Sequence, residues 1–127
     1  MASILVVEDT TDIRDILTRQ LRHAGHHVIS AVNGIEGIAF ARAQLPDLIV
    51  MDLIMPMLDG WEAIKQLKAD PRCANLPILA ISARALTETG DQARAAGCAA
   101  FMSKPFTMRE LFAAVDSLTG VADAVAS

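Results

Sequence analysis

Cysteine is scarce in this chain, which has 127 residues and two thiols, Cys73 and Cys98. The two positions do not fit the spacing of metal ligands in zinc sites. A single pair is also a weak basis for a disulfide. We therefore expect both side chains to be ordinary reduced thiols without a role in metal binding.

Positive charge and long apolar runs are also in short supply. Lys plus Arg number 11 against 15 Asp plus Glu, the formal net charge is −4, and the cations do not cluster. Such a chain repels a nucleic-acid backbone. The apolar run Ile4–Val7 is too short for a signal peptide, and no segment approaches the roughly 20 apolar residues of a membrane span. These absences predict a cytoplasmic protein with no nucleic-acid and no membrane partner.

The chain does contain a regular series of short apolar runs. Apolar residues make up 53 % of the sequence and charged residues 20 %, as in a folded single domain. Five runs are apolar at nearly every position, which is typical of strands that are covered on both faces in a parallel sheet. The five expected strands are Ile4–Val7, His27–Ala31, Leu48–Met51, Ile78–Ile81 and Ala99–Met102.

Segments with helical spacing follow each of these strands. The first has a single apolar stripe, and Thr10 or Thr11 can cap it. Gly90 lies inside the fourth and costs about 1 kcal/mol relative to alanine, which predicts a loosely held helix. The stripe of the first segment consists of Ile13, Ile16, Leu17 and Leu21. The expected helices cover about 13–21, 35–42, 61–68, 86–96 and 108–118.

This alternation predicts an α/β fold with helices on both faces of the sheet. We expect a (βα)5, flavodoxin-like, doubly wound five-stranded parallel sheet with strand order 2-1-3-4-5. No composition shift, linker or low-complexity stretch interrupts the pattern. The prediction is one domain over residues 1–120 and a short tail over 121–127.

The residues with reactive chemistry gather where the expected strands end. Glu8 and Asp9 end the first strand, Asp52 the third and Ser82 the fourth, and Lys104 follows the fifth. In the expected order these strand ends share one edge of the sheet, where open α/β folds bind ligands. Three carboxylates side by side repel one another, and Mg²⁺ is a suitable counter-ion. Lys104 and the Ser82 hydroxyl could then receive a phosphoryl group, with the Asp52 carboxylate as nucleophile toward phosphorus.

Each of these residues also has an ordinary structural interpretation. An acid after a strand is commonly a helix cap or a turn residue, and Lys-Pro pairs are common in turns. A shared site is favoured because four strand ends carry mutually compatible groups. It is also favoured because an uncompensated carboxylate at Asp52, beside the apolar Leu48–Met51, costs on the order of several kcal/mol.

Four segments of the chain match a known family. ILVVED at 4–9, LIVMDLIMPMLDG at 48–60, ILAISA at 78–83 and FMSKPF at 101–106 together resemble the receiver domain of two-component response regulators. The match covers residues 3 to about 118. The resemblance implies a single-domain response regulator that accepts phosphate from a histidine kinase or a histidine phosphotransfer protein and then changes its binding to a downstream protein target. Such a protein is no turnover enzyme and catalyses only its own phosphotransfer and slow dephosphorylation; we expect a monomer or a weak dimer.

The resemblance implies a role for each residue of the expected acid site. Asp52 corresponds to the phosphoacceptor. Glu8 and Asp9 correspond to the acidic pair that holds Mg²⁺, together with Asp52 and the backbone carbonyl of Ile54. Lys104 corresponds to the lysine that binds the phosphoryl group. A backbone ligand at Ile54 explains why an apolar side chain is tolerated there.

The resemblance also implies a switch. Ser82 corresponds to the switch hydroxyl and Phe101 to the switch aromatic, and the fourth helix, fifth strand and fifth helix form the responding face. The peptide bond before Pro105 is a candidate for the cis form. Phe101 stands where tyrosine is often found, and its switching must depend on packing alone. Arg84 lies at a position that tunes the lifetime of the phosphoryl bond.

Three other kinds of protein share part of this pattern. A haloacid-dehalogenase-type phosphatase usually has a second aspartate two residues after its nucleophile, where this chain has Ile54. A flavodoxin-like flavin carrier needs a hydroxyl- and glycine-rich anion loop in place of Glu8 and Asp9. A divergent receiver that acts without phosphorylation does not need the intact acid, hydroxyl and lysine set. Among phosphorylated receivers, the sequence leaves open a relay intermediate, an output effector and a phosphate sink.

Overall fold

The computed structural model describes residues 2–55, 58–83 and 87–120, and over this part of the chain it contains five strands and five helices. The strands are β1 (Ser3–Val7), β2 (His27–Ala31), β3 (Leu48–Asp52), β4 (Ile78–Ser82) and β5 (Ala100–Ser103). The helices are α1 (Thr11–His23), α2 (Gly34–Gln44), α3 (Gly60–Ala69), α4 (Thr87–Ala95) and α5 (Met108–Thr119).

The strands form one parallel sheet in the order β2-β1-β3-β4-β5, which confirms the predicted fold class and strand order. β1 lies between β2 and β3, with Leu5 opposite both Ile29 and Ile49. The ends of β1 and β3 are therefore neighbours at the point where the strand order reverses. β5 lies one residue later than predicted. The prediction used hydropathy alone, whereas the end of the strand is set by backbone pairing, which matches Ser82 with Ser103.

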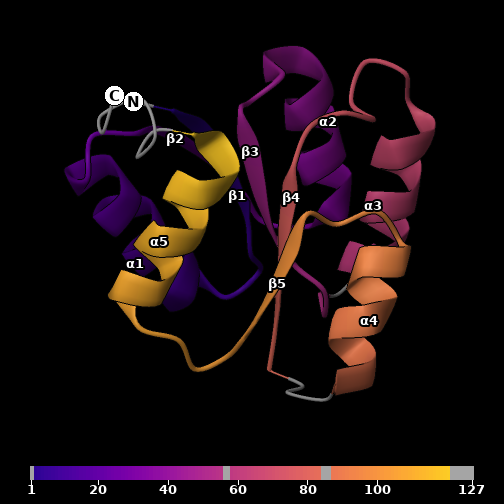
Figure 1. The fold of residues 1–127 in the computed structure, drawn as a ribbon. Coiled ribbons are helices and arrows are strands. Elements are labelled where there is room, and N and C mark those ends of the chain that lie inside the picture. Colours follow the sequence, from indigo (N-terminus) through magenta and orange to yellow (C-terminus); the bar gives the residue numbers. More distant parts are fainter. Residues whose placement is uncertain (1, 56–57, 84–86, 121–127) are drawn as a thin grey trace.

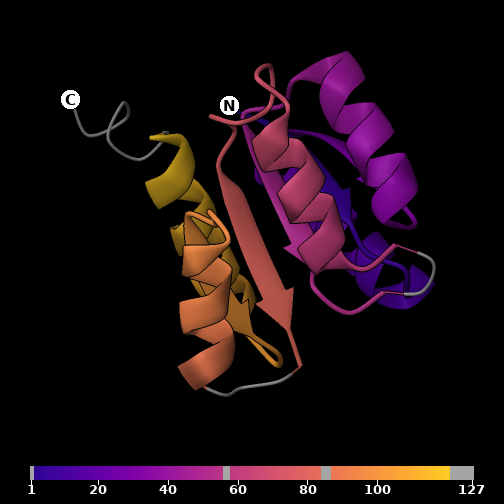
Figure 2. The ribbon, with the colours of Figure 1, turned by 90° about the vertical axis from the view of Figure 1, so that its right-hand side faces the viewer.

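The helices form a layer on each face of the sheet. α1 and α5 cover one face, and α2, α3 and α4 cover the other (Figure 1), as the view turned by 90° in Figure 2 also shows. Alternate residues of β1 face opposite layers: Ile4 and Val6 belong to the core under α1 and α5, and Leu5 and Val7 to the core under α2–α4. All four are fully buried, which explains why the strand is apolar at every position.

Side-chain caps begin three of the helices. Asn33 and Asp59 accept hydrogen bonds from the third backbone N–H of α2 and α3, and Thr107 forms a reciprocal capping box with Glu110 in α5. α1 differs. Thr10 occupies its N-cap position, as predicted, but makes no side-chain hydrogen bond to the helix.

The apolar stripe predicted on α1 is only partly buried. Leu17 and Leu21 are buried, whereas Ile16 is 50 % exposed. The difference arises because α1 packs on the sheet through its leucines, which leaves Ile16 at the edge of the contact. α4 is shorter than the predicted 86–96, and Leu86 lies outside the described residues. No helix in the described part of the chain is both long and apolar enough to cross a membrane.

Candidate functional site

Three carboxylates meet at the carboxyl edge of the sheet. Glu8 directly follows β1 and Asp9 comes next, while Asp52 is the last residue of β3. One oxygen from each lies within 4.8 Å of the others. Glu8 is fully buried, Asp52 is 4 % exposed and Asp9 is half-buried. The structure thus brings together the acids that the sequence predicted to converge.

Lys104 connects two of these acids. Its Nζ donates hydrogen bonds to Glu8 Oε1 at 2.9 Å and to Asp52 Oδ2 at 3.2 Å. The lysine follows β5, and its backbone N–H donates to the Ser82 carbonyl at the end of β4. The Lys104–Pro105 peptide bond is cis. The loop after β5 therefore places an ammonium against carboxylates from β1 and β3.

Burial and neighbouring charges shift the pKa values of Glu8 and Lys104. Burial, followed by the adjoining Asp52 carboxyl group, raises the pKa of Glu8 to about 8, and the Lys104 ammonium opposes this rise only in part. For Lys104, burial alone would lower the pKa. The hydrogen bond to Glu8 and the negative charge of Asp52 outweigh that effect and raise it. The pocket thus holds more acidic groups than one lysine can compensate.

The donor set fits a hard divalent cation. Three carboxylates offer oxygen ligands, which Mg²⁺ prefers. Glu8 Oε2 is buried and has no hydrogen-bond partner among the described residues, so one lone-pair-bearing atom in the cluster still lacks a partner. Asp52 Oδ1 accepts a hydrogen bond from the Ile54 N–H at 3.0 Å, which places the backbone after β3 beside the acids. The Ile54 side chain is 48 % exposed and takes no part.

The end of β3 also depends on a glycine. Gly60 begins α3, and its N–H donates to the Leu53 carbonyl at 3.1 Å. A Cβ at position 60 would collide with the backbone carbonyl oxygen of Asp52. The loop after Asp52 can close this tightly only because residue 60 has no side chain.

The expected switch residues lie on the two strands next to the acids. Ser82 is buried at the end of β4, and Phe101 is half-buried on β5, where it packs against the core under α2–α4. The Phe101 ring comes within 3.4 Å of where a Cβ on Gly90 of α4 would lie. Arg84, expected at the rim of the site, lies outside the described residues.

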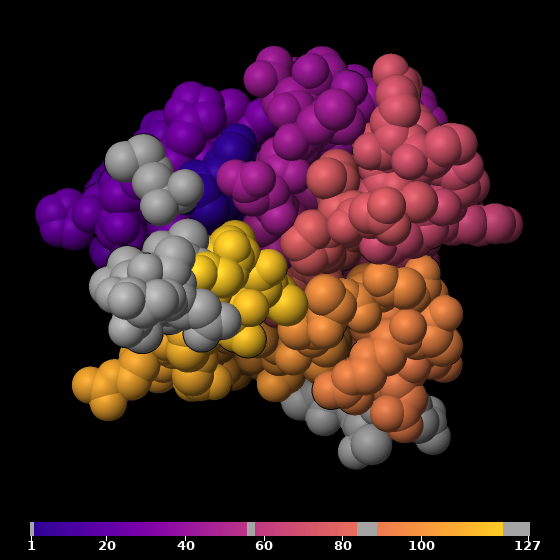
Figure 3. All heavy atoms as spheres, turned by 45° about the horizontal axis from the view of Figure 1, so that its top comes forward, coloured from indigo at the N-terminus to yellow at the C-terminus, as the bar shows by residue number. Residues whose placement is uncertain are grey.

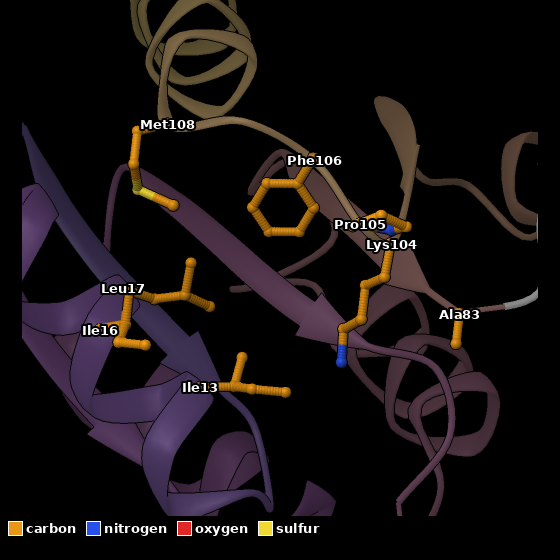
Figure 4. Close-up of a pocket in the computed structure, with 8 residues that line it drawn as sticks. All are labelled: Ile13, Ile16, Leu17, Ala83, Lys104, Pro105, Phe106 and Met108. Carbon is orange, nitrogen blue, oxygen red and sulfur yellow. The ribbon is translucent and has the colours of Figure 1, made fainter.

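An apolar groove beside the site did not emerge from the sequence. It has a volume of about 400 Å³, and Figure 4 shows α1 on one side facing Phe106 and Met108 on the other, with Lys104 and Pro105 at one end. The exposed Ile16 is part of its wall. The lining residues are Ile13, Ile16, Leu17, Ala83, Lys104, Pro105, Phe106 and Met108.

Arg14 is a further feature near the site that the sequence analysis did not single out. From the first turn of α1 it donates hydrogen bonds to the backbone carbonyls of Glu8 and Asp9. A cation one turn into the helix after an acidic pair was the available signal. That signal is weak, because the partners are main-chain atoms common to every sequence.

A doubly wound parallel sheet with three acids and a lysine at the β1/β3 reversal defines a class of phosphoacceptor signalling domains. Comparison with known proteins gives the family. Residues 4–116 match the model of the response regulator receiver domain. The chain belongs to this family, whose members bind Mg²⁺ at an acidic pocket and interact with histidine kinases or phosphotransfer proteins and with downstream targets.

Several relatives differ in how much of their length this chain covers. It is 36 % identical to the DNA-binding dual master transcriptional regulator RpaA of Synechocystis over 93 % of this chain, but spans only about half (49 %) of RpaA. It is 32 % identical to the polar-differentiation response regulator DivK of Brucella anthropi, covering 93 % of this chain and 96 % of DivK. The solved receiver domain of the sensor histidine kinase PA1611 from Pseudomonas aeruginosa, which contains a magnesium ion in its active-site cleft, is 31 % identical with a TM-score of 0.87, covering 94 % of this chain and 98 % of that one.

Proposed function

We propose that this chain accepts a phosphoryl group on Asp52 from a phosphohistidine donor and changes its partner binding in response. The observation that carries the proposal is the contact of Lys104 Nζ with both Glu8 and Asp52 inside a buried acid cluster. This arrangement holds the Asp52 side chain beside a cation that can follow a phosphoryl oxygen. The compartment proposed with this function is the cytoplasm.

The cation site in this proposal consists of Glu8, Asp9, Asp52 and the Ile54 carbonyl. Mg²⁺, when bound, supplies positive charge against the phosphoryl oxygens. The chain's own residues do the rest. A carboxylate oxygen of Asp52 attacks phosphorus, the N–P bond of the donor breaks, and the imidazole leaves with the electron pair and takes up a proton. Lys104 and the Ser82 hydroxyl then donate hydrogen bonds to the transferred group.

The proposed response passes from β4 to β5. Phosphorylation replaces one carboxylate charge with about two negative charges, which attract the buried Ser82 hydroxyl. Movement of Ser82 frees space for Phe101, which changes its packing against α4. The responding face is the one formed by α4, β5 and α5, whose atoms make a continuous band in the space-filling view (Figure 3). This is a local charge change that biases a two-state element.

The test compares two aspartate-to-asparagine variants. Asp52→Asn should abolish phosphate incorporation from a small acyl-phosphate donor with MgCl2, while its circular dichroism spectrum and Tm stay close to those of the unmodified chain. Asp12→Asn, which alters an exposed acid in the first turn of α1, is the control and should label fully. Intact mass spectrometry with and without hydroxylamine measures the acyl phosphate. Undiminished labelling of Asp52→Asn refutes the acceptor assignment.

The switch and the partner need a second experiment. Phosphotransfer profiling against purified histidine kinases and phosphotransfer proteins identifies the donor by its rate. A pull-down that compares beryllofluoride-treated and untreated chains then isolates proteins that bind the activated form. Identical binding in both states would instead support the alternative of a receiver that acts without phosphorylation.

A further inference from the structure

Arg14 reaches back from α1 to the loop that carries the acidic pair. Its Nη1 lies 2.9 Å from the Glu8 carbonyl oxygen and 3.3 Å from the Asp9 carbonyl oxygen. Its Nη2 lies 3.5 Å from Thr11 Oγ1. The side chain is half-buried, and hydrogen bonds from a charged donor are roughly twice as strong as neutral ones. One nitrogen thus ties two successive peptide groups of the loop.

The same loop lacks the side-chain cap that begins other helices of the chain. Thr10 makes no capping hydrogen bond, in contrast with the caps of α2, α3 and α5. Pairing with β2 extends as far as Glu8, whose N–H donates to the Ala31 carbonyl at 3.1 Å. Arg14 therefore acts where strand pairing ends and capping is missing.

We propose that Arg14 is a positioning residue for the cation site. By fixing the peptide groups that follow Glu8 and Asp9, it holds their carboxylates toward Asp52. The inference rests on the proposed function, because it requires these acids to bind a divalent cation. Residues that orient metal ligands commonly affect affinity about 10- to 100-fold without touching the metal.

The guanidinium has two effects of opposite sign on cation binding. Its positive charge repels a second cation nearby, so removing Arg14 should tighten binding if charge alone matters. If Arg14 orients the ligands, its removal should weaken binding. The direction of the change therefore distinguishes positioning from electrostatics.

The experiment measures Mg²⁺ by calorimetry and Mn²⁺ by electron paramagnetic resonance, without any phosphodonor. Arg14→Met keeps the apolar stem and removes the donors, and should weaken both cations about tenfold or more. Arg14→Lys offers several donors from one nitrogen and should bind within about threefold of the unmodified chain. The control is Arg22→Met: Arg22 donates to the Val28 carbonyl at 2.9 Å from the same helix, about 12 Å farther along its axis.

The control separates a local role from general stability. Both methionine variants lose hydrogen bonds from α1 to backbone carbonyls, two in Arg14→Met and one in Arg22→Met. Both should therefore lower Tm, but only Arg14→Met should change cation affinity. Unchanged or tighter binding by Arg14→Met overturns the proposal, as does an equal loss in Arg22→Met. If Arg14→Met does not fold, Arg14→Gln and Arg22→Gln give the same comparison. An unmodified chain that binds neither cation refutes the proposed function itself, whereas normal binding with an indifferent Arg14 refutes only the positioning role.

Discussion

The raised pKa of Glu8 predicts that the metal-free protein becomes less stable as pH rises from 5 to 8. The folded state holds a proton on Glu8 up to a pKa of about 8, whereas the unfolded chain releases it near the ordinary value of 4.5. Between these values the folded state binds more protons, so the free energy of unfolding falls with increasing pH. Each pKa unit corresponds to about 1.36 kcal/mol. The linkage relation gives a loss of roughly 3–4 kcal/mol between pH 5 and pH 8.

Urea denaturation in EDTA at several pH values tests this prediction, with Glu8→Gln as the comparison. Glutamine has nearly the same shape and does not titrate, so the difference between the two free energies of unfolding reports the titration of Glu8 together with its interactions with Asp52 and Lys104. The difference in free energy of unfolding between the two proteins should change by the full amount of roughly 3–4 kcal/mol between pH 5 and pH 8. Saturating MgCl2 should reduce the fall, because a cation on Glu8 displaces the proton. Parallel curves for the two proteins would refute the reasoning that burial keeps Glu8 protonated.

Three substitutions test other parts of the site by urea denaturation and cation titration. Lys104→Met removes the partner of Glu8 and Asp52 and should lower the stability of the metal-free protein by about 3 kcal/mol, partly restored by MgCl2; an unchanged midpoint would contradict the role of these two hydrogen bonds. Gly60→Ala places a Cβ against the Asp52 carbonyl and should cost about 2 kcal/mol and weaken Mg²⁺ binding. Gly90→Ala, within α4, would bring a methyl group no closer than 3.4 Å to the Phe101 ring of β5 and should stabilise the protein by about 1 kcal/mol; a loss of stability would show that this contact cannot accept the methyl group.

The sheet and the acid cluster could be predicted from the sequence for a single physical reason. Strands buried on both faces must be apolar throughout, so the polar residues that end them stand out. Parallel topology then brings those ends to one edge. Glu8 and Asp52 are 44 positions apart along the chain, yet a strand order alone was enough to place them together.

Details that depend on how a helix is rotated against the sheet, or on hydrogen bonds to main-chain acceptors, could not be predicted. Hydropathy groups Ile16 with Leu17 and Leu21, but only the packing angle of α1 decides that Ile16 lies at the groove. The Arg14 hydrogen bonds have backbone carbonyl oxygens as acceptors. Every residue has such an oxygen, so the sequence does not indicate these bonds. Thr10 has the residue type of a cap, and its missing hydrogen bond is a matter of side-chain geometry.

The position of Lys104 links two neighbouring spaces of the molecule. Its ammonium contacts Glu8 and Asp52, while the same side chain closes one end of the groove beside α1. Any event that pulls the ammonium away from Glu8 also reshapes that apolar wall. A compound designed to fill the groove would therefore disturb the position of Lys104 in the neighbouring acid cluster without contacting an aspartate.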